Sequence, residues 1–94
     1  MIFLVILKKV YKHKSFIKSY NKRIKGNKRL EDSFKLRLLL LLTNPYSPKL
    51  RLHRLKGTMQ DYYAVSLTGD IRIVLMFEDD NIYLIDIGSH NQVY

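Results

Sequence analysis

Three histidines are the side chains of this sequence that could move a proton near neutral pH: His13, His53 and His90. His90 lies two residues after the end of a strand-like run, Ile82–Gly88, that stops at a glycine. A titratable side chain at the end of a rigid element can be held in place for acid–base chemistry. The alternative is an ordinary surface histidine after a strand, and for this stretch alone that is the more common case.

The segment around His53 is dense in positive charge. Such a segment could hold a phosphate backbone and present His53 to it. The leucines at 50 and 52 alternate with polar residues, as in a short or edge strand, and Gly57 then permits a turn. The alternative is a basic surface loop. The candidate phosphate-binding residues are Lys49, Arg51, Arg54 and Lys56.

One arginine lies within an otherwise apolar strand-like run, Ile71–Phe77. Side chains alternate between the two faces of a strand, so Arg72 faces away from the apolar residues at 71, 73, 75 and 77. Two interpretations remain open for it. Arg72 reaches the rim of the sheet, or it is held on a functional face to meet a phosphate.

Positive charge is concentrated in the first part of the chain. Residues 1–57 hold sixteen of the seventeen lysines and arginines and only two acids, Glu31 and Asp32, for a net charge of +14. Residues 58–94 hold Arg72 and six acids, for a net charge of −5. A basic region of this density attracts polyanions. Nucleic acid is the first expected partner, and an acidic protein is the next.

Length and composition limit the kind of protein. The 94 residues are expected to form a single domain, 1–94, and 47% of them are hydrophobic, enough for a modest core. Cysteine is absent, and the histidines lack the spacing of metal ligands, so we expect no disulfide, metal or cofactor. The apolar run at the N-terminus is too short to span a membrane and a poor signal peptide. We expect a soluble cytoplasmic protein.

The first half of the chain predicts one strand and two helices. Ile2–Leu7 suits a buried strand, and Lys8–Lys14 is a basic connector. A first helix begins with Ser15 as its N-cap and stops at Gly26. A second helix, capped by Asn27, carries an apolar stripe and ends before Pro45. The stripe consists of Leu30, Phe34, Leu38 and Leu41.

The last third predicts a meander of three strands. They are Tyr62–Leu67, Ile71–Phe77 and Ile82–Ile87, joined by the loops 68–70 and 78–81. The whole order predicts a two-layer α/β domain of the α+β kind, with a helix hairpin packed on one face of a small, mostly antiparallel sheet. The other face is then left open and could hold His53, Arg72, His90 and Tyr94.

Three motifs in this order resemble the RelE/ParE superfamily of bacterial toxins, and most closely its YafQ-like branch of type II toxin–antitoxin systems. The resemblance is convincing over residues 30–94. It extends to the N-terminus only through the predicted order of one strand followed by two helices. The motifs are Leu52–Gly57, Asp70–Val74 and Asp86–Tyr94.

The resemblance implies a RelE-like fold and an mRNA interferase. Such a toxin usually cuts mRNA on the ribosome and is neutralised by a cognate antitoxin. His53, Asp70 and Arg72 match the family's motif histidine, an acid of the YafQ-like branch and a phosphate-contacting strand arginine. His90 matches the histidine after the terminal Gly-Ser, and Tyr94 matches the terminal aromatic.

The chain also departs from the family pattern. YafQ-like toxins often carry a second histidine where this chain has Ser66, and a tryptophan where it has Ile71. The first departure leaves the general acid uncertain, and the roles of His53 and His90 are interchangeable at this point. The resemblance also admits a ParE-like inhibitor of DNA gyrase without nuclease activity. A plain RNA-binding module is a third reading.

Overall fold

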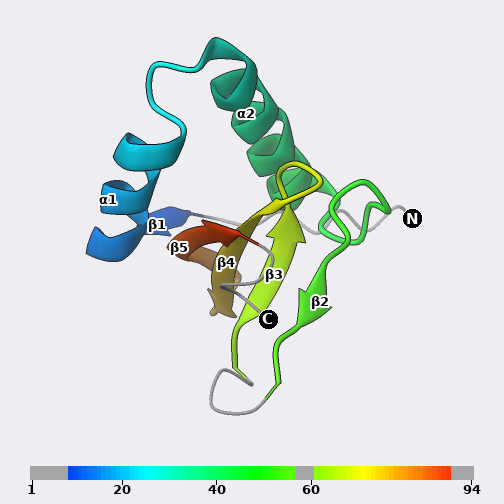
Figure 1. Cartoon of the computed structure of the whole chain (residues 1–94). Coiled ribbons are helices and arrows are strands. Elements are labelled where there is room, and N and C mark those ends of the chain that lie inside the picture. Colours follow the sequence, from blue (N-terminus) through cyan, green and yellow to red (C-terminus); the bar gives the residue numbers. More distant parts are fainter. Residues whose placement is uncertain (1–8, 57–60, 90–94) are drawn as a thin grey trace.

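The computed structural model describes residues 9–56 and 61–89. The five strands of this part of the chain form one sheet in the order β1-β5-β4-β3-β2, with β1 parallel to β5 and the other neighbours antiparallel. Both helices lie on one side of this sheet (Figure 1). The predicted α+β fold is confirmed. The elements are β1 (Val10–Lys12), α1 (Lys14–Arg23), α2 (Lys28–Thr43), β2 (His53–Arg54), β3 (Tyr63–Ser66), β4 (Ile71–Glu78) and β5 (Asn81–Ser89).

The first described strand lies in the segment predicted as a connector. The predicted strand Ile2–Leu7 is outside the described residues, whereas β1 occupies Val10–Lys12, so the connector prediction is wrong there. The backbone of β1 pairs with β5, and Tyr11 stacks on Tyr83 with ring centroids 4.9 Å apart. As an edge strand, β1 keeps exposed polar residues, so its sequence lacks the apolar run of a buried strand.

Helix α1 has its N-cap two residues earlier than predicted. His13 is its N-cap, and its Nδ1 accepts from the Ser15 backbone N–H at 3.2 Å. The hydroxyl of Ser15 donates instead to the Ile85 carbonyl of β5. The prediction of Ser15 as the N-cap is therefore wrong, because that hydroxyl ties the helix to the sheet. His13 has a structural role in this position.

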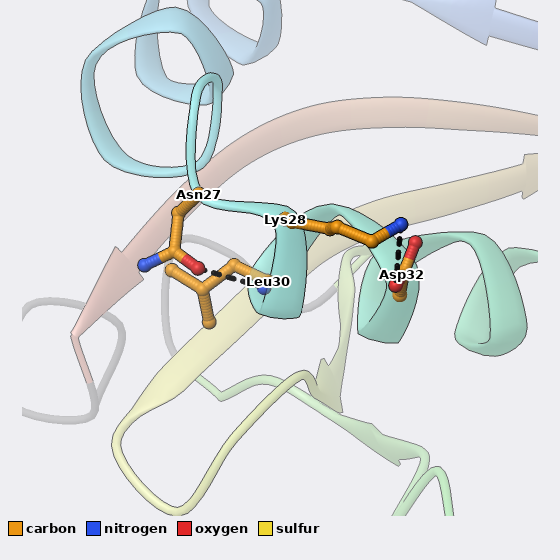
Figure 2. A network of polar contacts seen from close by, with 4 residues as sticks. All are labelled: Asn27, Lys28, Leu30 and Asp32. Atoms are coloured by element: carbon orange, nitrogen blue, oxygen red, sulfur yellow. Dashed lines mark hydrogen bonds and ion pairs between the residues drawn. The ribbon is translucent and has the colours of Figure 1, made fainter.

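Helix α2 begins and ends as predicted. The Asn27 side chain accepts from the Leu30 backbone N–H at 3.2 Å, and Lys28 forms an i, i+4 ion pair with Asp32 at 3.7 Å (Figure 2). Gly26 precedes the cap with a φ of 88°, which a glycine adopts without strain. No helix in the described part of the chain is long and apolar enough to cross a membrane.

The main core lies between the helices and the sheet. Phe34 of α2 contacts both Phe16 and Tyr20 of α1, with ring centroids 5.7 and 5.2 Å apart. Positions 38–42 of α2 are all leucine; in this leucine run Leu41 is fully buried, whereas Leu39 is 56% exposed. The run is thus core on one side of the helix only. The predicted stripe of α2 faces the core cluster, which contains Phe34, Leu41, Ile73, Leu75, Leu84 and Ile87 among others.

A β-bulge in β5 changes which of its side chains face the helices. Val74 pairs with Asp86 and Leu75 with Leu84, so Ile85 is an extra residue in the ladder. Because of this insertion, Leu84 and Ile87 both reach the helix-side core although they are three positions apart. The Asp86 carboxylate accepts from the Ser19 hydroxyl at 2.5 Å, a second polar link between α1 and β5.

The β4–β5 connection is tighter than the predicted four-residue loop. Glu78 pairs with Asn81, which leaves only Asp79 and Asp80 in the turn. Their φ angles are 51° and 64°, and two positive φ values are the mark of a type I′ hairpin turn. The predicted β3–β4 turn at 68–70 is confirmed, since β3 ends at Ser66 and β4 begins at Ile71.

Candidate nucleic-acid interface

An open pocket of about 660 Å³ lies between α2, the loop after it and the β3–β4 turn. Its lining includes three cationic side chains, and none of the described residues that line it is acidic. Such a pocket favours an anion over a cation or an apolar group. Lys49 and Arg51, two of the predicted phosphate-binding residues, lie in it. The lining residues are Arg37, Pro48, Lys49, Arg51, Ser66, Thr68 and Gly69.

The loop that carries Lys49 and Arg51 is fixed at its middle residue. Leu50 is fully buried, and its carbonyl accepts from the Ser66 backbone N–H at 2.8 Å. Arg51 has a φ of 51°, a left-handed conformation that non-glycine residues seldom adopt. The two cations therefore flank a buried anchor that presents them beside β3.

His53 is held by the carbonyl of Arg51. Its Nδ1 lies 2.9 Å from that oxygen. A carbonyl oxygen only accepts, so Nδ1 carries the hydrogen in this contact and the neutral ring has its lone pair on Nε2. The loop thus selects the tautomer in which Nε2 is the basic nitrogen. His53 is exposed, as a residue that meets a large substrate must be.

Arg72 is buried and bonded to the adjacent turn. Only 8% of the residue is exposed, and its Nη1 donates to the carbonyls of Thr68 at 2.8 Å and Gly69 at 3.2 Å. Arg72 is therefore not at the sheet rim. It lies on the face opposite the helices and contacts two pocket-lining residues through their backbone.

His53 and Arg72 lie on the same face of the sheet. His53 pairs with Ala64, and Arg72 pairs with Ser66, two residues further along β3. Two strand spacings and two residue steps place their Cα atoms roughly 12 Å apart. The middle of this face is not open as predicted, because a small cluster is buried there. Its buried members are Leu55, Ala64 and Val74.

The remaining described candidates lie away from the pocket lining. Arg54 points to the opposite face from His53, as its strand neighbour, and lies 3.8 Å from the Asp61 carboxylate. Lys56 is exposed just after β2. Asp70 is exposed in the β3–β4 turn, where its backbone N–H donates to the Thr68 hydroxyl at 3.3 Å.

His90 and Tyr94 lie outside the described residues, so their predicted roles stay predictions. The last described residues of β5 run beside Arg72, since Gly88 pairs with it and Ser89 pairs with Ile71. His90 follows Ser89 directly in the sequence. Within 9–56 and 61–89, no group of three or more His, Cys, Asp or Glu side chains could hold a metal ion.

Arg37 is the pocket residue that the sequence did not indicate. It lies on α2 among other basic residues. A basic residue on a helix is normally interpreted as part of the solvent-exposed face of that helix. Thr68 and Gly69 were likewise not expected to line a pocket. Only the packing of α2 over the β3–β4 turn, where the Ser33 hydroxyl donates to the Leu67 carbonyl at 3.1 Å, brings them together.

This fold is that of small bacterial toxins of the YafQ and YoeB/ParE kind. The family of the bacterial toxin of type II toxin–antitoxin systems, YafQ, matches residues 8–94. The chain therefore belongs to the YafQ family of type II toxin–antitoxin toxins. Among curated protein sequences, none matches the chain.

Solved structures agree with this assignment. A copper-bound mutant toxin from Helicobacter pylori is 26% identical, with a TM-score of 0.64 over 92% of this chain and 98% of that chain. A YoeB/ParE toxin from Agrobacterium tumefaciens is 18% identical, with a TM-score of 0.75 over 88% and 99%. YafQ in the DinJ–YafQ toxin–antitoxin complex of Escherichia coli is 19% identical, with a TM-score of 0.69 over 95% and 99%.

Proposed function

We propose that this toxin is an endoribonuclease that cleaves mRNA, on the ribosome, and so inhibits translation. One observation carries the proposal: His53 is bonded to the backbone of Arg51, which itself lines a pocket with three cations. A tautomer-fixed histidine beside an anion pocket is the combination that phosphodiester chemistry requires. Membership in the YafQ family supports the same activity.

The proposed reaction uses the RNA's own 2′-OH as nucleophile. A base takes the 2′-OH proton, the 2′ oxygen attacks phosphorus, and the bond from phosphorus to the 5′ oxygen breaks while an acid protonates that oxygen. The products are a 2′,3′-cyclic phosphate and a 5′-OH. No metal or other cofactor is needed, because the proton transfers and charge stabilisation come from side chains.

We assign the proton transfers to His53 and His90, one as base and the other as acid. The Nε2 basicity of His53 favours it as the base. Arg72 stabilises the phosphorane with help from Lys56, and Arg54 contributes by reaching around the edge strand β2. Because Arg72 is bonded to the turn, it acts on the phosphate only if its guanidinium moves or if it orders the turn around the site.

Two further residues have proposed contacts with the substrate. Tyr94 stacks on a base or donates a hydrogen bond near the cleaved phosphate. Asp70 orients a histidine or contacts a base, and its exposure at the β3–β4 turn is compatible with either role.

A cognate antitoxin is the proposed protein partner. The Escherichia coli relative is seen with the antitoxin DinJ. An acidic antitoxin segment lying across the basic pocket would exclude RNA, and one pairing with the short edge strand β2 would extend the sheet. Because its proposed substrate is mRNA on the ribosome, we propose that the toxin acts in the cytoplasm. We also propose that it forms a hetero-oligomer with its antitoxin.

Primer extension on cellular mRNA after induced expression tests the activity. Wild-type toxin should give discrete cuts within codons, and both His53→Ala and His90→Ala should abolish most of them. His13→Ser is the matched control, because serine is a good N-cap and His13 has no proposed catalytic role. If both alanine variants cut as well as wild type, the mechanism is wrong. Intact mRNA with trapped gyrase–DNA complexes would instead identify a ParE-like gyrase inhibitor.

A further inference from the structure

Arg37 is placed in the pocket without a full set of hydrogen-bond partners. Its Nε is buried, and no acceptor within the described residues reaches it. A buried donor left without an acceptor costs roughly 1–3 kcal/mol. The guanidinium nonetheless lines a pocket that also contains Lys49 and Arg51. A ligand oxygen that entered the pocket and shifted this side chain would supply the missing acceptor.

The β3–β4 turn, on the other side of the pocket, is compatible with a bound anion. Its carbonyls at Thr68 and Gly69 would repel a phosphate if they faced the pocket, but both accept from Arg72. Arg72 thereby draws partial negative charge away from the pocket lining. Asp70, the acid next in the chain, is not among the lining residues.

We propose that Arg37, Lys49 and Arg51 bind one phosphodiester group of the RNA that is adjacent to the cleaved group and distinct from it. The RNA as ligand rests on the proposed function. Arginine suits the role because its planar fork binds two phosphate oxygens at once, whereas lysine acts as a point charge. Arg37 is thus a substrate-positioning residue on α2, outside the motifs that carry the family resemblance.

Binding can be measured apart from cleavage with a fluorescent, fully 2′-O-methylated RNA oligonucleotide, which lacks the nucleophile. Titrations at several salt concentrations compare wild type with Arg37→Gln and Arg37→Lys. Losing one phosphate contact should lower the salt-dependence slope by about 0.7. We expect Arg37→Gln to weaken binding about tenfold or more, a typical loss for one charge-assisted contact, and Arg37→Lys to weaken it less.

Lys35→Gln is the matched control, because Lys35 is exposed on the same helix, carries the same charge and does not line the pocket. It should bind within about twofold of wild type. A second probe replaces single phosphates of the oligonucleotide by neutral methylphosphonates. At one position the replacement should weaken wild-type binding and should weaken Arg37→Gln by less, because only Lys49 and Arg51 still contact that phosphate in the variant.

Equal losses for Arg37→Gln and Lys35→Gln, or additive losses at every methylphosphonate position, would overturn the subsite. The outcome is independent of catalysis. If the toxin leaves mRNA intact but one methylphosphonate position depends on Arg37, the proposed nuclease activity is refuted and the phosphate subsite is retained. If cleavage is normal but no position depends on Arg37, only the subsite is refuted.

Discussion

Ser66 and Arg72, paired across β3 and β4, donate to the same oxygen. The Ser66 hydroxyl lies 3.0 Å and the Arg72 Nη1 2.8 Å from the Thr68 carbonyl. The shared acceptor joins two neighbouring strands to the turn that connects them. Ser66 also lines the pocket, so this contact links the buried arginine to the anion site.

Replacing Arg72 by methionine should destabilise the protein by about 1–3 kcal/mol, because the partly buried carbonyls of the turn lose their donor. Ser66→Ala should cost about 1 kcal/mol. Since the two donors share Thr68, the double variant should depart from additivity by at least about 0.5 kcal/mol. Urea unfolding of all four proteins measures this. Strictly additive losses would mean that the shared carbonyl does not couple the two side chains.

Arg51 combines a left-handed backbone with a charged side chain, and two substitutions separate these features. Arg51→Gly should be more stable than Arg51→Ala by about 1 kcal/mol, since glycine adopts a positive φ without strain. Both variants remove the cation, so both should bind the uncleavable RNA equally weakly. Thermal unfolding and anisotropy titrations measure the two effects. Equal stabilities would argue that the loop relaxes to negative φ once the arginine is gone.

His53→Asn and His53→Gln distinguish a base from a positioning residue. The asparagine amide can replace Nδ1 and keep the bond to the Arg51 carbonyl, whereas the glutamine amide reaches toward the Nε2 position. If Nε2 transfers the proton, both variants should lose about 10²–10⁴ in single-turnover cleavage. RNA binding should persist in His53→Asn. Near-normal cleavage by His53→Asn would mean that His53 acts only through its Nδ1 contact and does not transfer the proton.

Asp80→Gly should stabilise the β4–β5 hairpin by about 0.5–1 kcal/mol, because Asp-Gly suits a type I′ turn better than Asp-Asp. Differential scanning calorimetry should show a rise in Tm of a few degrees. Glu78→Gly is the control: it lies in strand β4, and glycine there should lower Tm. A drop in Tm for Asp80→Gly would contradict the turn type.

Tyr20 should contribute a pH dependence to stability at alkaline pH. Burial, and secondly the nearby Glu31 carboxylate, raise the pKa of Tyr20 above its ordinary 10.0. The folded protein therefore holds this proton after the unfolded chain has released it. The contribution is complete below about pH 10 and is lost as the pH rises through the folded pKa.

Urea unfolding of wild type and Tyr20→Phe at about pH 8 and about pH 11 checks this. The phenylalanine variant should lose less stability between the two. Tyr46→Phe, at a tyrosine that is 80% exposed, should behave like wild type. If Tyr20→Phe loses as much stability as wild type between the two pH values, the loss comes from other ionisable groups.

Periodicity predicted the parts of the fold that depend on burial. The apolar stripe ending at Leu41 and the alternation around Arg72 both correspond to observed faces, because burial imposes a regular spacing. β1 was missed because the backbone of β5, rather than an apolar pattern, specifies it. The N-cap was misplaced because Ser15 has a tertiary acceptor that no local rule reveals.

The candidate site was predictable only where its residues are close in sequence. Lys49, Arg51 and His53 lie within one basic segment, and their proximity follows from that. Arg37 enters the pocket through the packing of α2 across the sheet, which no sequence spacing encodes. The hydrogen bonds from Arg72 to the β3–β4 turn were also not predicted. The alternation of a strand fixes the face on which an arginine lies, but not whether its side chain extends away or folds back onto the turn.

The pairing of β1 with β5 has a consequence for the order of folding. β5 is the last of the described strands along the chain, yet it lies between β1 and β4 and supplies the acceptors for both Ser15 and Ser19 of α1. Contacts between segments so distant in sequence form slowly. On a translating ribosome, β1 and α1 must therefore wait without their partner until residues 81–89 emerge. Strand order alone delays completion of the described sheet until β5 has been synthesised.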